Sequence, residues 1–311
     1  MTGDPVVSVN VPCYRQLPHA RRTVASLLAQ TFERFEITLL DDGASDEYAA
    51  YVASLGDARV RYRRNPERLG AMRNMFSAIA YGSGAYSMAF HEDDLLSTTY
   101  LESVMGIFER HPSCAFVACQ LLEFTDDPSP ETLAAPHTPL AYEVFPAGAD
   151  LVRGILHGLE PMFGSVVYRR AALAGVEPDH AAYATLVDRP FLLDIMARGH
   201  SGAVIRSPLV WYRHHGEGDT RHLAMTADHI LRLLRIYRDA LPADWTPGDR
   251  DAFFRYSGYW LFELYRLTPP AQRPPVWKYL FRAWRQGLYN PRARGRFGVR
   301  QIQRALLNQT S

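Results

Sequence analysis

The sequence of 311 residues has few cysteines and almost no excess of charge, and each shortage excludes a class of protein. Cys13, Cys114 and Cys119 are odd in number and lack the paired spacing of a metal site, which is typical of a reducing compartment rather than a disulfide scaffold. A formal net charge of +1 argues against a dedicated nucleic-acid-binding protein. No signal peptide opens the chain, and no stretch is apolar for the roughly 18 residues that a membrane-spanning helix needs. We therefore expect a cytoplasmic protein with no nucleic-acid partner.

Glycine-rich phosphate-binding motifs are also missing. The chain has no GxxxxGK(S/T) phosphate loop, and no GxGxxG follows its first predicted strand. The pair Gly82 and Gly84 precedes a predicted strand, so it indicates a helix stop and a turn instead. These absences disfavour a nicotinamide-dependent dehydrogenase.

Predicted strands and helices alternate through the first part of the chain. Runs rich in β-branched and apolar residues predict strands at 5–12, 35–40, 58–65 and 85–90. Helical patterns lie between them, and another follows at 99–110. Such alternation implies right-handed crossovers, and so an α/β fold with a mostly parallel central sheet that helices cover on both faces.

Each of these strands ends in a polar cluster. The clusters are CYRQ at 13–16, DDGASD at 41–46, NPERLG at 65–70 and HEDD at 91–94. In parallel sheets of this type, ligands bind beyond the carboxyl ends of the strands. We therefore expect one site at this edge, where a tyrosine, an aspartate pair, arginine and asparagine lie near the acidic cluster.

The acidic cluster has two interpretations. Glu92, Asp93 and Asp94 follow the apolar run GAYSMAF, and adjacent carboxylates need water, backbone donors or a cation to offset their repulsion. An acidic turn before a helix capped by Thr99 and Glu102 is the simpler interpretation. The place of the cluster at the shared sheet edge favours a metal site, because carboxylates suit Mg²⁺ and Mn²⁺.

Arginines near this edge suit a nucleotide diphosphate. A cation on Asp94 would bridge the phosphates while Arg68 or Arg73 supplies guanidinium contacts. Both arginines are equally compatible with solvated positions on a helix face. The residues alone leave these two interpretations open.

Taken in order, these motifs resemble the family 2 glycosyltransferases of the GT-A fold. The resemblance rests on VSVNVPCYRQ, ASLLAQTFERFEITLLDDGASD, NPERLGAMRN and HEDDLL, and it extends to LVDRPFLLDIMARG and WYRHHGE, roughly from residue 5 to 220. It implies a GT-A, Rossmann-like fold with a helical C-terminal extension. It also implies an enzyme that uses a nucleotide-diphospho-sugar donor.

The resemblance implies roles for residues at the strand ends. Asp94 would coordinate a divalent cation, Mn²⁺ or Mg²⁺, on the diphosphate, and Glu92 offers a second phasing of the same motif. Arg15 stands where the family often has asparagine and is a further candidate. In the implied nucleotide site, Asp42 meets the base and Asp93 lies near the ribose, and the full set is Pro12, Tyr14, Asp42, Arg73 and Asp93.

Asp188 matches the acid that serves as general base in inverting members of the family. It would take the proton of the acceptor hydroxyl as that oxygen attacks the anomeric carbon opposite the leaving diphosphate. Its position two residues before Pro190 is also typical of a helix N-cap. A histidine near the WYRHHGE stretch, His214 or His215, would approach the metal or the diphosphate, and Arg213 or Arg221 would meet phosphate.

We expect three parts in the chain: a nucleotide-sugar-binding half at 1–125, an acceptor-binding and catalytic half at 126–222, and a helical region at 223–311. No acidic residue follows Glu263. The helix predicted there either packs on the catalytic domain with a solvated basic face, or docks on an anionic membrane that presents a lipid-linked acceptor. Its apolar face comprises Trp277, Leu280, Phe281, Trp284 and Leu288.

The resemblance thus implies a metal-dependent inverting glycosyltransferase with a UDP- or dTDP-linked donor. Its hydroxyl acceptor would be a cell-envelope glycan, a lipid carrier or a natural product. A sugar-nucleotide nucleotidyltransferase is less favoured, because those families carry a Gly-rich loop after the first strand and CYRQLPH has no glycine. A non-catalytic nucleotide- or glycan-binding relative is less favoured because Asp42, Asp93, Asp94 and Asp188 are all present.

Overall fold

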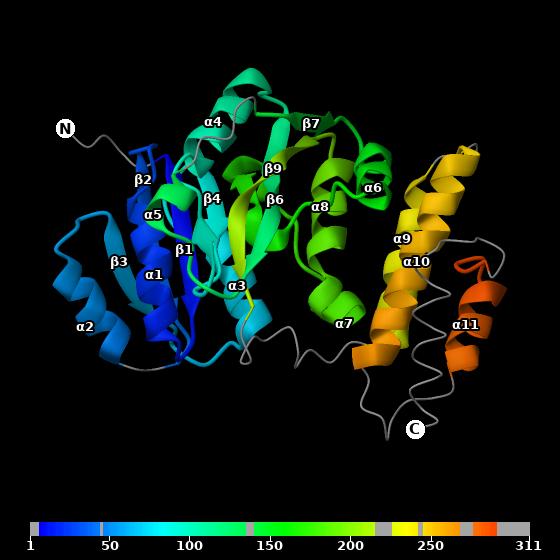
Figure 1. Ribbon diagram of the computed structural model, residues 1–311, viewed down its shortest axis with the longest axis horizontal. Helices are drawn as coiled ribbons and strands as arrows, with labels where there is room; N and C mark the ends of the chain where they lie inside the picture. The colour runs from blue at the N-terminus through cyan, green and yellow to red at the C-terminus, as the bar shows by residue number, and fades with distance from the viewer. Residues whose placement is uncertain are drawn as a thin grey trace. The chain divides into compact units, whose positions relative to one another are not determined.

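The computed structural model describes residues 6–43, 46–134, 140–214, 226–241, 245–267 and 276–290 (Figure 1). The chain forms two compact units. Unit 1 comprises residues 1–147, 159–176 and 195–219, and unit 2 comprises residues 148–158, 177–194 and 220–311. The three-part division predicted from the sequence, with boundaries after 125 and 222, stays a prediction.

The first half of the sheet in unit 1 is parallel, as the alternation predicts. β1 lies between β2 and β4, and β3 pairs with the outer side of β2. α3 packs against β1 and β4 (Figure 1). The elements are β1 (Val7–Cys13), α1 (Leu17–Leu28), β2 (Phe35–Asp41), α2 (Asp46–Leu55), β3 (Val60–Arg64), α3 (Ala71–Ala80) and β4 (Tyr86–Ala89).

The second half of the sheet is mixed. β8 lies antiparallel between β4 and β6, whereas β6 and β9 are parallel, and β5 and β7 each pair antiparallel with β9. Alternation fixes the direction of a strand only where a crossover helix leads into it, and β8 returns from a segment of unit 2. The elements are β5 (Leu95–Leu96), α4 (Tyr100–Arg110), β6 (Cys114–Phe124), α5 (Pro130–Leu133), β7 (Tyr142–Phe145), η1 (Phe163–Ser165), β8 (Val167–Arg169), η2 (Arg170–Leu173) and β9 (Ser201–Arg213).

Two polar features of β1 are explained by its neighbours. Asn10, which interrupts an apolar strand, donates through Nδ2 to the carbonyl oxygens of Ala78 (2.8 Å) and Tyr81 (2.9 Å) at the end of α3. Ser8 lies so close to Gly82 that a Cβ on this glycine would be 2.3 Å from the Ser8 Oγ. Gly82 also has a φ of 99°, so the turn predicted here needs glycine for both reasons.

Unit 2 is helical, and α9 supplies much of its core through Ile230, Leu231, Leu233, Leu234 and Tyr237. This confirms the predicted helical C-terminal region. Among the described helices, none combines the length and apolar character needed to cross a membrane. The elements are α6 (Gly148–Leu156), α7 (His180–Tyr183), η3 (Ala184–Leu186), α8 (Asp188–Ala197, which continues into unit 1), α9 (Ala227–Ala240), α10 (Pro247–Leu267) and α11 (Val276–Arg285).

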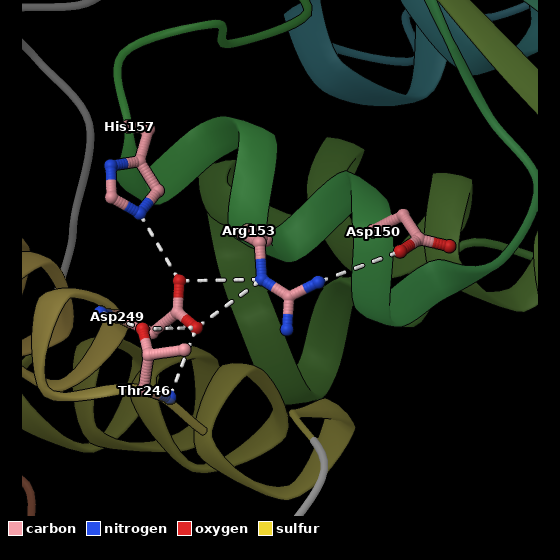
Figure 2. A network of polar contacts seen from close by, with 5 residues as sticks. All are labelled: Asp150, Arg153, His157, Thr246 and Asp249. Carbon is pink, nitrogen blue, oxygen red and sulfur yellow. Dashed lines mark hydrogen bonds and ion pairs between the residues drawn. The ribbon is translucent and has the colours of Figure 1, made fainter. Parts of the chain in front are cut away.

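A buried carboxylate ties α6 to the start of α10 (Figure 2). Asp249 accepts hydrogen bonds from the Arg153 Nε, 3.3 Å from both carboxylate oxygens, and from the Thr246 backbone N at 3.2 Å and Oγ1 at 3.0 Å. The His157 Nε2 lies 3.2 Å from Asp249 Oδ1, and Arg153 also faces Asp150 at 3.7 Å. We call these five residues the Asp249 clamp.

Candidate metal and nucleotide site

The loop at residues 91–94, here called the acidic loop, follows β4 and brings three ligand groups together. One ligand atom from each of His91, Asp93 and Asp94 lies within 4.8 Å of the others. The His91 Nδ1 is 3.3 Å from Asp94 Oδ2. One imidazole nitrogen and two carboxylates at such spacing suit a divalent transition metal. His91, which opens the HEDD stretch, is not among the ligands predicted from the sequence.

Asp94 is only 2% exposed, and burial raises the pKa of its carboxyl group above the ordinary range. The hydrogen bond and charge of His91, together with the Arg213 backbone N–H that donates to Asp94 Oδ1 (2.9 Å), offset this in part. Asp93 acts in the opposite direction, because its negative charge raises the same pKa further. A cation at this position would favour the ionised form of Asp94.

The backbone of the acidic loop is held from two sides. Thr23 on α1 donates through Oγ1 to the carbonyl oxygens of Glu92 and Asp94, both at 2.8 Å. Arg213 at the end of β9 donates from Nε to the Asp93 carbonyl oxygen at 2.8 Å, and its Nη2 lies 2.7 Å from Asp127 Oδ1. Arg213, predicted as a phosphate contact, is thus buried and supports the loop.

The capping interpretation of this region does not hold. Thr99 precedes α4, but its side chain makes no capping hydrogen bond. Glu102 instead accepts a hydrogen bond at 2.7 Å from the Thr31 hydroxyl. The charges of the acidic loop are therefore not part of a capping box.

Glu92 points away from the three ligand groups, toward the end of β1. Its carboxylate accepts hydrogen bonds from the Tyr14 backbone N (2.6 Å) and from the Tyr48 hydroxyl (2.5 Å). Burial raises the pKa of Glu92 to about 7, although these two hydrogen bonds lower it. The structure therefore groups Asp93 and Asp94 with His91, and it does not group Glu92 with them as an alternative ligand.

Asp42 fastens the NPERLG loop to the end of β2. Its Oδ1 accepts hydrogen bonds from the Asn65 Nδ2 (2.9 Å) and the Leu69 backbone N (2.7 Å), and its Oδ2 accepts one from the Gly70 backbone N (2.8 Å). Gly70 has a φ of 80°, which favours glycine at this turn into α3. A carboxylate has about four acceptor positions, so roughly one remains for a ligand.

The Tyr14 ring, which follows β1, has two guanidinium groups beside it, one from Arg15 and one from the NPERLG loop. The guanidinium carbons of Arg68 and Arg15 lie 4.6 Å and 5.2 Å from the centroid of the Tyr14 ring. Arg15 has a φ of 59°, which is uncommon for a residue other than glycine and is found at turns near functional sites. Pro12 lies opposite Leu40 in the sheet, and Arg73 is exposed in the first turn of α3.

Two further predicted residues have partners of their own. Asp188 is the first residue of α8 in unit 2, is buried, and has the Arg189 Nη1 at 3.3 Å from both carboxylate oxygens. His214 lies 3.0 Å from Glu123 and stacks edge-on against Tyr212, with a centroid separation of 5.5 Å. His215 and Arg221 lie outside the described residues.

Comparison with known sequences finds a match to one family model over part of the chain. Residues 8–152 match the model of glycosyl transferase family 2. An uncharacterized protein of Mycobacterium tuberculosis is 28% identical over 240 residues, which is 75% of each chain. The Escherichia coli UDP-Glc:alpha-D-GlcNAc-diphosphoundecaprenol beta-1,3-glucosyltransferase WfgD is 28% identical over 108 residues, covering 35% of this chain and 43% of WfgD. The matched region thus spans less than half of that glucosyltransferase.

Comparison with solved structures shows the fold. TarS of S. aureus in complex with UDP-GlcNAc aligns with a TM-score of 0.56 at 14% identity, covering 91% of this chain and 92% of TarS. The mannosyltransferase PcManGT of Pyrobaculum calidifontis, in complex with GDP-Man and Mn²⁺, aligns with a TM-score of 0.54 at 16% identity, covering 93% and 82%. At such identities the likeness concerns the fold alone.

Proposed function

We propose that the chain is a family 2 glycosyltransferase that transfers a sugar from a nucleotide-diphospho-sugar to a hydroxyl acceptor, since residues 8–152 match the model of that family and the fold is that of solved glycosyltransferases. The observation that carries the proposal is the convergence of His91, Asp93 and Asp94 at the carboxyl end of β4, in the unit that also holds Asp42. The family match weakens both rivals, the nucleotidyltransferase and the non-catalytic binding protein.

The proposed donor carries UDP or dTDP. A uracil or thymine ring has one N–H donor on its pairing edge, and the remaining acceptor position of Asp42 suits such a donor. The Tyr14 ring, with Pro12 beside it, would face the base, while Arg15, Arg68 and Arg73 would meet the phosphates. The name of WfgD and the complex of TarS support a uridine nucleotide, whereas PcManGT keeps GDP as a second candidate.

We propose that a divalent cation binds His91, Asp93 and Asp94. The donor set fits such an ion, since the buried Asp94 carries an incompletely offset charge and the ligand atoms already lie close together. When bound, the cation would supply charge neutralisation on the diphosphate leaving group. Mg²⁺ prefers oxygen ligands, so the imidazole of His91 favours Mn²⁺ over Mg²⁺.

Asp188 is the proposed general base. Its carboxylate would accept the proton of the acceptor hydroxyl while that oxygen forms a bond to the anomeric carbon. The bond from this carbon to the diphosphate oxygen breaks with its electrons on the nucleoside diphosphate, so the configuration inverts. The family resemblance and the burial of Asp188 support this role. Asp188→Asn should lower the transfer rate by about 10²- to 10⁴-fold and leave nucleotide affinity unchanged.

The acceptor is proposed to be a cell-envelope glycan, a lipid carrier or a natural product. The name of WfgD, whose acceptor is a diphosphoundecaprenol, supports the lipid carrier. Cytoplasmic residence is also proposed, and it is supported by Cys13, Cys114 and Cys119, which are free and buried. A lipid-linked acceptor would require the protein to reach a membrane surface.

Calorimetric titration of UDP, dTDP and GDP tests the proposal. Each nucleotide is titrated with Mn²⁺ and with a chelator into the wild type, Asp94→Ala and the control Asp239→Ala, an exposed carboxylate on α9. We expect one nucleotide to bind only with metal, to lose affinity in Asp94→Ala and to keep it in Asp239→Ala. Release of nucleoside diphosphate from the matching nucleotide sugar then tests catalysis. Failure of every nucleotide to bind a folded protein would refute the proposed function.

A further inference from the structure

Helix α11 exposes two large aromatic side chains. Phe281 is 51% exposed and Trp284 is 54% exposed, the highest values among the described large hydrophobic residues that are exposed. Their ring centroids are 5.8 Å apart. Aromatic rings of this size are normally buried in the core. Two exposed rings on one helix are therefore a candidate contact surface.

Other residues of α11 and of the turn that follows it pack within unit 2. Ala283 and Leu288 are fully buried. Arg282 pairs with Asp228 on α9, and the Arg238 Nη1 donates to the Gln286 carbonyl oxygen at 2.8 Å. Because these contacts hold the helix, the exposed rings are not needed to fix it in place. The single apolar face predicted for this helix is divided in the structure, because Leu288 is buried whereas Phe281 and Trp284 are exposed.

Cations flank the aromatic pair. At about 100° per residue, Lys278 and Arg285 project next to Phe281, on the side away from Trp284, and both are exposed. We call Lys278, Phe281, Trp284 and Arg285 the aromatic-cationic face. The chain that follows continues the charge, with Arg292, Arg294, Arg296, Arg300 and Arg304 and no acid.

We infer that the aromatic-cationic face docks on an anionic membrane surface. Tryptophan and phenylalanine rings enter the headgroup region, while lysine and arginine beside them contact anionic lipid headgroups. An anionic surface is the complementary partner, since no acidic residue follows Glu263. One exposed face of a ten-residue helix is small for a stable protein interface, whereas a membrane surface can accept a face of this size. Only the link to a lipid-linked acceptor rests on the proposed function; the membrane contact does not.

Vesicle co-sedimentation of the full chain tests this inference. The vesicles contain phosphatidylcholine alone or phosphatidylcholine with phosphatidylglycerol. We expect the wild type to sediment with the anionic vesicles and not with the neutral ones. The double variant Phe281→Ser/Trp284→Ser should lower the bound fraction by roughly tenfold, and Lys278→Glu/Arg285→Glu should abolish the lipid preference. Leu122→Ser, which removes an exposed leucine from β6, is the matched control and should bind as the wild type does.

Three outcomes would overturn the inference. The first is the absence of wild-type binding to anionic vesicles, and the second is unchanged binding by the aromatic double variant. The third is a wild-type dimer in light scattering that the same variant converts to monomer, since a second copy would then be the occupant. Circular dichroism and nucleotide titration show whether each variant is folded. Nucleotide binding without vesicle binding would refute only the membrane contact, and the reverse would refute only the proposed function.

Discussion

Asp94 and Asp249 are both buried aspartates, but the pKa of Asp94 is raised and the pKa of Asp249 is lowered. Asp249 is surrounded by donors, and although burial acts to raise its pKa, hydrogen bonds from His157 and Thr246 and the charge of Arg153 outweigh it and lower the pKa (Figure 2). At Asp94 burial prevails, and the pKa is raised despite His91. Asp249, which stabilises the fold, is paired with donors and a positive charge from the same chain. On the proposal above, a bound cation would offset the negative charge of Asp94 in the acidic loop.

Asp94→Asn tests the ligand side of this comparison and should have the largest effect. Loss of one charged ligand is expected to weaken Mn²⁺-dependent nucleotide binding by roughly 100- to 1000-fold. The free energy of unfolding should stay within about 0.5 kcal/mol of the wild type or rise, because a buried charge is removed. Calorimetry and chemical denaturation measure the two quantities. A large loss of stability with nucleotide affinity retained would reverse the roles assigned to the two aspartates.

Asp249→Ala tests the structural side. It removes the shared acceptor of Arg153, His157 and Thr246, and the free energy of unfolding should fall by about 2 kcal/mol. Arg153 and His157 are partly exposed and can regain water, which keeps the loss below that of a fully buried pair. Nucleotide affinity should not change. A loss of nucleotide binding by a folded Asp249→Ala protein would contradict a purely structural clamp.

The pH dependence of stability provides a second test of the same residue. The folded pKa of Asp249 lies below the ordinary value of 3.8, so its contribution is complete above that pH and is lost as the pH falls through the folded pKa. Wild type and Asp249→Ala should therefore differ most at neutral pH and converge in acid. Denaturation midpoints measured from neutral pH down to the acid limit of folding check this. A difference that grows as the pH falls would have the wrong sign.

His91→Asp tests whether His91 makes the proposed cation site prefer Mn²⁺ to Mg²⁺. Replacement of the imidazole by a third carboxylate should shift the ratio of Mn²⁺ to Mg²⁺ affinity toward Mg²⁺ by about tenfold, because Mg²⁺ prefers oxygen ligands. The readout is direct, since free Mn²⁺ has an electron paramagnetic resonance signal that Mg²⁺ competition restores. Gly164→Ala is a useful control, because a Cβ there would contact the His91 ring at 3.4 Å without changing the ligand set. An unchanged ratio in His91→Asp would exclude His91 as a ligand.

How far the sequence predicted these two regions depends on the range of the contacts involved. β1 to β4 and the aspartates that follow them were predictable, because strand and helix alternate locally and the ends of parallel strands share an edge. The direction of β8 was not, since it enters the sheet from unit 2. His91 was missed because its contact with Asp94 arises in a loop, where no helical or strand period signals it. The Asp249 clamp joins residues as far as 96 positions apart, and no local pattern marks such a pair.

Thr246 offers the smallest and most selective test, because it separates neutral from charged donors around Asp249. Its Oγ1 accepts a hydrogen bond from the Asp249 backbone N at 3.1 Å, while the Asp249 carboxylate accepts one from the Thr246 backbone N, so the two residues form a capping box at the start of α10. Thr246→Ala should lower the free energy of unfolding by about 1 kcal/mol, and Thr246→Ser should retain most of it.

If charge dominates at Asp249, Thr246→Ala will keep most of the pH dependence that Asp249→Ala removes, since Arg153 still faces the carboxylate. If hydrogen bonding dominates, the pH dependence will fall together with the stability, because His157 and Thr246 precede Arg153 among the groups that lower this pKa. Urea denaturation of wild type, Thr246→Ala and Thr246→Ser at neutral and acid pH distinguishes the two. The second result would mean that a carboxylate can be made structural without a cation. The contrast with Asp94 would then rest on the number of donors around each aspartate and not on their charge.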